Sequence, residues 1–181
     1  NTSKLKVIPL GGLEQIGLNI TAFEYEDSII VVDCGLSFPE DDMLGVDLVI
    51  PDISYLVKNA DKVRGIVLTH GHEDHIGAIP YLLKNFNVPI YGTRLTLGLV
   101  EGKLKEHRLD SSAKLNVVKP GDIIKLGAFS VEFIHVNHSI PDAVAVVDPH
   151  RKDCPSEFKD FAGVGMAFHL VCALEGDADW V

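Results

Sequence analysis

Cysteine is scarce in this sequence, and its few cysteines lie far apart. Cys34, Cys154 and Cys172 are odd in number, and no Cys-x-x-Cys pair occurs. A disulfide framework needs an even set of cysteines, and a cysteine-based zinc site needs close pairs. We therefore expect free thiols in a reducing compartment.

The sequence also lacks long apolar runs and an excess of positive charge. No run reaches the ~20 apolar residues that span a bilayer, so we expect no membrane partner. The sequence has 16 Lys and Arg residues and 26 Asp and Glu residues, which gives a formal net charge of −10. A stand-alone nucleic-acid binder is expected to be basic. If the substrate is a nucleic acid, bound cations or a basic partner domain must offset the phosphate charge.

What is present is sufficient for one α/β domain. The chain has 181 residues, of which 46% are hydrophobic, enough for a core. Alternating or continuous apolar runs predict strands at 4–10, 19–25, 28–33, 63–68, 89–92, 114–118, 123–126 and 129–136. Apolar residues at helical spacing predict one helix ending near Phe86 and another over residues 94–106.

Three histidines and two carboxylates fall between His70 and His75, where a buried strand ends and a helix begins. His70 and His72 are two apart on an extended segment, so both imidazoles can bind one cation. Asp74 and His75 lie on the first helical turn and can hold a second cation nearby. Cations ~3.5–4 Å apart activate a water and stabilise a leaving oxygen. The alternative is a polar helix start that only offsets the helix dipole.

Two further polar residues end apolar strands. Asp33 ends the strand predicted at 28–33 and needs a buried partner, so it could orient a metal-ligating histidine. A simple turn cap is the alternative for Asp33. His138 follows the strand at 129–136 and could supply a third imidazole to the first cation, although a lone histidine there is usually structural.

The loop at 39–47 is rich in oxygen ligands. It contains four acidic residues, the last of which is Asp47. Carboxylate and carbonyl oxygens suit a hard cation such as calcium. A solvated acidic loop is the alternative.

The stretch Thr69-His70-Gly71-His72-Glu73-Asp74-His75-Ile76-Gly77 resembles the signature of the metallo-β-lactamase superfamily. Further stretches resemble ribonuclease J, a member of the β-CASP group, and the resemblance covers about residues 5–142. These stretches are 38–52, 88–93 and 137–142. The resemblance implies an α/β fold, the metallo-β-lactamase-like αββα sandwich, of which this chain carries an incomplete, N-terminal part.

The resemblance also implies a site with two metal ions, usually zinc, with manganese as an alternative. His70, His72 and His138 match the ligands of one ion. Asp74 and His75 match ligands of the other ion, and we expect these two to be the catalytic residues.

In the acidic loop, Gly45 and Asp47 match a segment that can bind a structural calcium in this family. The family loop Gly-Gly-Leu-Gly-Glu-Ile-Gly-Lys-Asn is changed here at Glu14, Gln15 and Leu18.

The resemblance implies metal-dependent hydrolysis of RNA in the cytoplasm, as a 5′-to-3′ exonuclease and an endonuclease. RNA would be the partner, and any homo-oligomer would form through regions that this sequence lacks. Two alternatives are a hydrolase of small esters or thioesters and an inactive metal-binding fragment. The carboxylate that bridges both ions in the family has no match here, so we expect weak activity.

The last segment of the sequence differs from the rest. Residues 143–181 resemble a fragment of the DHH-type single-strand-specific DNA exonucleases, without that family's metal motif. We therefore divide the chain into a metallo-β-lactamase-like part, 1–142, and a tail, 143–181. The tail is expected to form a strand, a loop and a helix that serve only for packing.

Overall fold

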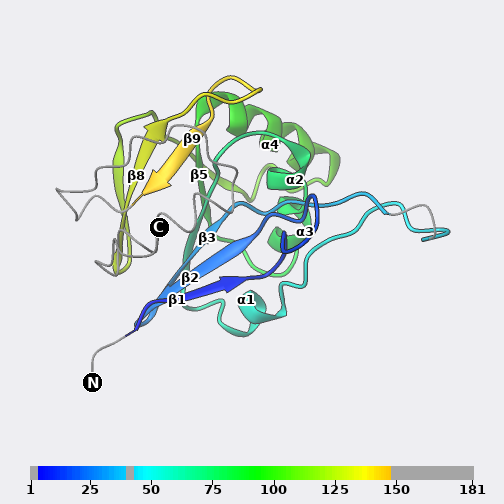
Figure 1. Cartoon of the computed structure of the whole chain (residues 1–181), viewed down its shortest axis with the longest axis horizontal. Coiled ribbons are helices and arrows are strands. Elements are labelled where there is room, and N and C mark those ends of the chain that lie inside the picture. Colours follow the sequence, from blue (N-terminus) through cyan, green and yellow to red (C-terminus); the bar gives the residue numbers. More distant parts are fainter. Residues whose placement is uncertain (1–3, 40–42, 148–181) are drawn as a thin grey trace.

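The computed structural model describes residues 4–39 and 43–147. Two sheets lie face to face, with all the described helices on the outer face of the larger one (Figure 1). The larger sheet has six strands in chain order: β1 (Lys6–Pro9), β2 (Thr21–Tyr25), β3 (Ser28–Val32), β4 (Val63–Val67), β5 (Pro89–Gly92) and β6 (Lys114–Val117). The smaller sheet holds β7 (Ile123–Leu126), β8 (Phe129–His135) and β9 (Val144–Val147).

The larger sheet changes from antiparallel to parallel at β3. Strands β1, β2 and β3 pair antiparallel, and β3 to β6 pair parallel. Parallel neighbours need crossover connections, which here contain the helices. These helices are α1 (Ser54–Lys58), α2 (Glu73–Ile76), α3 (Ile79–Leu83) and α4 (Arg94–Glu106).

The two cores follow from the alternation of side chains along the central strands. Ile29 and Val31 on β3 face the helices, whereas Ile30 and Val32 face the smaller sheet. Successive residues of a strand point to opposite faces, so a fully apolar strand can serve both cores. The predicted metallo-β-lactamase-like sandwich is confirmed, and the described residues supply one helical layer and two sheets.

The helix after the histidine cluster is shorter than predicted. Instead of one helix reaching Phe86, the chain forms α2 and α3, with Gly77 and Ala78 between them. Pro80 lies in the first turn of α3 and has no N–H to donate to Ile76, so a continuous helix would be interrupted there. The break separates the site-bearing turn α2 from the packing helix α3.

The smaller sheet continues past the predicted domain boundary at residue 142. Strand β9 pairs antiparallel with β8, and Val144 and Val146 are buried between the sheets. The boundary stays a prediction, and the helix expected further along the tail lies outside the described residues. Among the described residues, no helix is long and apolar enough to cross a bilayer.

Phe23 tests the packing between the two sheets, because its side chain is fully buried there. Phe23→Ala should lower the free energy of unfolding by about 3–5 kcal/mol, through lost apolar burial and the cavity left behind. Ile123→Ala is the control, since Ile123 is 57% exposed and should change stability by less than about 1 kcal/mol. Urea unfolding curves of the parent chain and the two variants measure both effects. Equal losses of unfolding free energy in the two variants would contradict the assigned core.

Candidate metal centre

The predicted site residues gather where parallel strands β3 and β4 end. Asp33 follows β3, and His70 lies shortly after β4, whose carboxyl end is on the same edge of the sheet. Open α/β sheets bind ligands outside the carboxyl ends of their strands. The turn of α2 then brings His72, Asp74 and His75 back over this edge.

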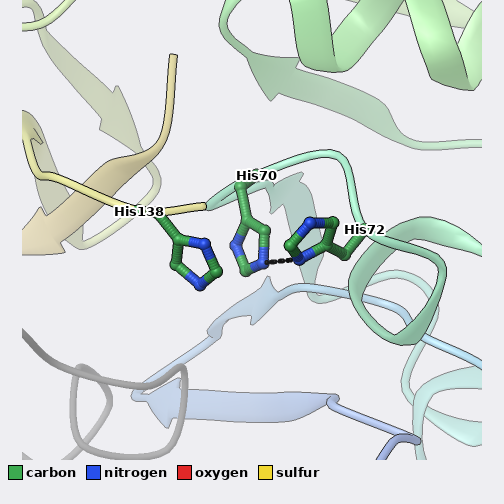
Figure 2. A group of neighbouring side chains, drawn as sticks. All are labelled: His70, His72 and His138. Carbon is green, nitrogen blue, oxygen red and sulfur yellow. Dashed lines mark hydrogen bonds between the residues drawn. The ribbon is translucent and has the colours of Figure 1, made fainter. Parts of the chain in front are cut away.

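Three imidazoles from two segments far apart in the sequence meet at this edge. His70, His72 and His138, called the histidine cluster below, have candidate ligand nitrogens within 4.8 Å of one another. Figure 2 shows His70 and His72 joined by a hydrogen bond and His138 approaching from its own loop. His70 Nε2 lies 3.1 Å from His72 Nδ1, and the ring centroids of His70 and His138 are 4.3 Å apart.

The tautomer of His70 follows from its neighbours. Thr69 Oγ1 lies 2.8 Å from Asp33 Oδ2 and 3.0 Å from His70 Nδ1. An ionised carboxylate only accepts, so the Thr69 hydroxyl donates to Asp33 and accepts from the N–H of His70 Nδ1. The lone pair of His70 is therefore on Nε2, the nitrogen that faces His72.

The loop carrying His138 is tied to the rest of the site by two bonds. Val144 N–H donates to Thr69 O over 2.9 Å, next to the start of the cluster. Thr93, the residue before α4, donates its hydroxyl to Asp142 O over 3.1 Å and makes no side-chain cap bond to the helix. These bonds hold the C-terminal flank of the loop, at Asp142 and Val144, beside the carboxyl edge of the sheet.

His138 itself is exposed and less fixed than His70. Its Nδ1 accepts the backbone N–H of Ser139 over 2.7 Å, which leaves the imidazole proton on Nε2. Coordination through Nε2 therefore requires the bond to Ser139 to be given up. The partly exposed ring of His72 can likewise move its proton to Nε2 and free Nδ1.

A second group lies beside the cluster. His75 Nδ1 donates to Asp33 Oδ2 over 2.7 Å, so the His75 lone pair is on Nε2. That atom lies 3.4 Å from Asp74 Oδ2. The rings of His70 and His75 are 4.0 Å apart, which places the two predicted cation sites side by side.

Burial and charge act differently on the two buried histidines. Burial, followed by the nearby imidazole of His75, lowers the pKa of His70 to about 4. Burial also opposes the charged form of His75, but the Asp33 carboxylate outweighs it and raises the pKa of His75 above its ordinary value. A neutral His70 at pH 7 is the form that binds a metal ion.

Close backbone approach fixes α2 against the segment after β3. Cys34 N–H donates to His75 O over 2.7 Å, and Leu36 N–H donates to Glu73 O over 3.2 Å. A Cβ on Gly35 would lie 1.6 Å from Asp74 O, so only glycine fits there. The close packing of Gly35 against Asp74 O fixes how far Asp74 and His75 lie from the sheet edge.

The donor set fits a transition ion. Zinc binds imidazole nitrogen at 2.0–2.1 Å, which places two tetrahedral ligands about 3.4 Å apart. The 3.1 Å separation of His70 Nε2 and His72 Nδ1 is close to this value. Three neutral imidazoles leave a fourth position for water, as in catalytic zinc sites.

Other predicted or overlooked residues stand as follows. Asp47 is exposed and Gly45 has a positive φ of 79° with open space around it, so a calcium site there stays a prediction. The contacts of Thr69 and Asn19 with site residues were not predicted. For Asn19, the available signal was its match to the last position of the family loop.

Comparisons with known proteins agree with this geometry. The family model described as the metallo-beta-lactamase superfamily matches residues 16–154. Ribonuclease J 1 of Streptococcus pyogenes is 48% identical over 167 residues, which cover 90% of this chain and 30% of that protein. Ribonuclease J of Synechocystis is 51% identical over 144 residues, covering 78% of this chain and 22% of that protein. This chain thus spans less than a third of the length of these curated relatives.

A solved structure supports the fold. The metallo-beta-lactamase superfamily protein of Sulfolobus tokodaii superposes with a TM-score of 0.52 at 22% sequence identity, covering 82% of this chain and 61% of that chain.

The match to the Streptococcus pyogenes protein covers 90% of the chain and so includes part of the predicted tail.

Removal of one imidazole should weaken metal binding. His138→Ala should lower the affinity for the first zinc or cobalt ion by more than the ~10–100-fold that is typical when a group supporting a ligand is lost. His135→Ala is the matched control, because His135 is exposed on β8 and outside the cluster. Elemental analysis and chelator competition measure both; equal affinities for the two variants would exclude His138 as a ligand.

Acidification should destabilise the metal-free chain between about pH 6.5 and about pH 4. In this window unfolded His70 binds a proton that folded His70 does not, so stability falls as pH falls. His75 does not cancel this slope, because its contribution is complete below about pH 6.5 and is lost only as pH rises through its folded pKa.

Urea unfolding across that window, after removal of metal, measures the slope. The variant His70→Gln should show a flatter slope than the parent chain. An unchanged slope would mean that the imidazole of His70 titrates normally in the folded state.

Proposed function

Because the chain belongs to the metallo-β-lactamase superfamily, we propose that it is the metal-binding part of an RNA-hydrolysing enzyme of the ribonuclease J type. The observation that carries this proposal is the histidine cluster, whose nitrogens converge within 4.8 Å beside His75 and Asp74. RNA as the substrate is supported by the identity of 48–51% to ribonucleases J.

The chemistry follows from the positions of these side chains. Two divalent ions, when bound, supply an activated water and stabilise the leaving oxygen of a phosphodiester. The histidine cluster would hold one ion, and Asp74 and His75 would hold the other. Asp33 keeps the His75 proton on Nδ1 and leaves Nε2 free to ligate.

Zinc is the proposed metal, with manganese as the alternative, because neutral imidazole and carboxylate ligands suit both. A structural calcium at Gly45 and Asp47 and action on RNA in the cytoplasm are further parts of the proposal. Its support is the similarity of the sequence to ribonucleases J.

The proposed activity of this chain alone is weak. Among the described residues, Asp74 and His75 are the two proposed ligands of the second ion. A loosely held ion cannot position water and leaving oxygen together, and a misplacement of ~1 Å can cost ~100-fold in rate. The net charge of −10 also gives no general attraction to phosphate.

Turnover of a 5′-monophosphorylated RNA with added zinc or manganese tests the proposal. We expect slow cleavage that His72→Ala abolishes, because this variant loses a ligand of the first ion. His135→Ala should cleave like the parent chain.

Two results would contradict these expectations. Fast, processive cleavage that depends on His72 would mean that a tail carboxylate bridges the two ions, with Asp148 or Asp160 the first to test. Hydrolysis of small esters that depends on His72, without any cleavage of RNA, would replace the ribonuclease proposal by the esterase alternative.

A further inference from the structure

The side chain of Asn19 lies within hydrogen-bond distance of Asp74 and His75, the two residues assigned to the second ion, although Asn19 lies outside α2, the helix that carries both. Asn19 lies between β1 and β2, 55 positions before Asp74. Its Nδ2 lies 3.0 Å from Asp74 Oδ2, 3.1 Å from Asp74 O and 3.3 Å from His75 Nε2. The amide therefore faces the carboxylate and the imidazole at the atoms expected to bind the ion.

The backbone holds this amide in place. Asn19 N–H donates to Asp74 O over 3.1 Å, and Gly35 N–H donates to Asn19 O over 3.0 Å. The preceding residue, Leu18, is buried and has a φ of 54°, a left-handed conformation that leucine rarely adopts. Such strain persists only where surrounding contacts fix the conformation, and it is common beside functional sites.

The two hydrogen bonds of the Asn19 amide, to His75 and to the Asp74 carboxylate, differ in whether they can persist beside a bound metal ion. His75 Nδ1 donates to Asp33, so His75 Nε2 has a single lone pair, and Asn19 Nδ2, which can donate to it, lies 3.3 Å away. The reversed amide would place an oxygen against the Asp74 carboxylate, which is repulsive, so the nitrogen belongs on this side. A metal ion on His75 Nε2 uses the same lone pair and must replace that hydrogen bond. Asp74 Oδ2 has further lone pairs, so its bond to Asn19 can persist.

We propose that Asn19 is a positioning residue for the second metal ion. Its amide holds the Asp74 carboxylate toward His75 before the ion arrives, and it keeps Asp74 oriented once the ion has taken the His75 lone pair. The inference rests on the proposed two-ion function. Loss of a group that orients a ligand typically lowers metal affinity ~10–100-fold. That loss should fall on the second ion, because within the described part of the chain no hydrogen bond joins Asn19 to a member of the histidine cluster.

Stepwise titration of the full 181-residue chain with cobalt(II), followed by its absorption spectrum and by chelator competition, tests this role. Asn19→Ala should weaken the second ion by ~10–100-fold and leave the affinity for the first ion unchanged. Asn19→Ser is a second variant, in which the hydroxyl is too short to reach Asp74, and it should behave in the same way. Asn85→Ala is the matched control, because the Asn85 amide donates to Tyr81 O on the exposed surface.

The affinity for the first ion also reports whether each variant is folded. Unchanged affinity for the second ion in both Asn19 variants, or equal losses for both ions, would overturn the inference and leave the proposed function intact. A parent chain that takes up only one ion at any cobalt concentration would overturn the two-ion function and the inference with it.

Discussion

The buried carboxylate of Asp33 is the constraint on which the site depends. The residue is 2% exposed and its oxygens accept three hydrogen bonds, from Thr69 N–H, the Thr69 hydroxyl and His75 Nδ1. A buried charge is tolerated only when its acceptors are satisfied, so these three donors cannot be exchanged freely. Through them one carboxylate sets the tautomers of both His70 and His75, and with them the lone pairs that face the two predicted ion positions.

The same constraint explains the unusual backbone around Asp33. The residue has a φ of 60°, which turns the chain sharply at the end of β3. Cys34 N–H can then bond to His75 O, and Gly35 can pack directly against Asp74 O. Strand β3, the loop after β4 and the turn α2 therefore form one rigid unit. That unit fixes His70, Asp74 and His75, and the smaller sheet joins it through Val144 N–H, which donates to Thr69 O.

The sequence was sufficient for the parts of the fold and site that depend on local spacing. The hairpin of β2 and β3, the convergence of His70 and His72, and the placement of His138 after β8 all follow from periodicity and motif. The sequence was insufficient where one distant contact decides the conformation. Asn19 meets Asp74 only because the β1–β2 loop folds back over α2. Glu14 has a φ of 54° where the family loop has glycine, which propensity alone would have disfavoured.

The site is thus rigid on one side and adaptable on the other. His70 is buried and hydrogen-bonded, and its pKa of about 4 keeps it neutral as an ion arrives. His138 is exposed, and its Nδ1 accepts from Ser139, so it can reorient at little cost in packing. An arriving ion would meet His70 and His72 first, because their nitrogens already lie 3.1 Å apart, and then recruit His138. Of the three proposed ligands, the one whose present hydrogen bond must break, His138, is therefore also the one exposed to solvent.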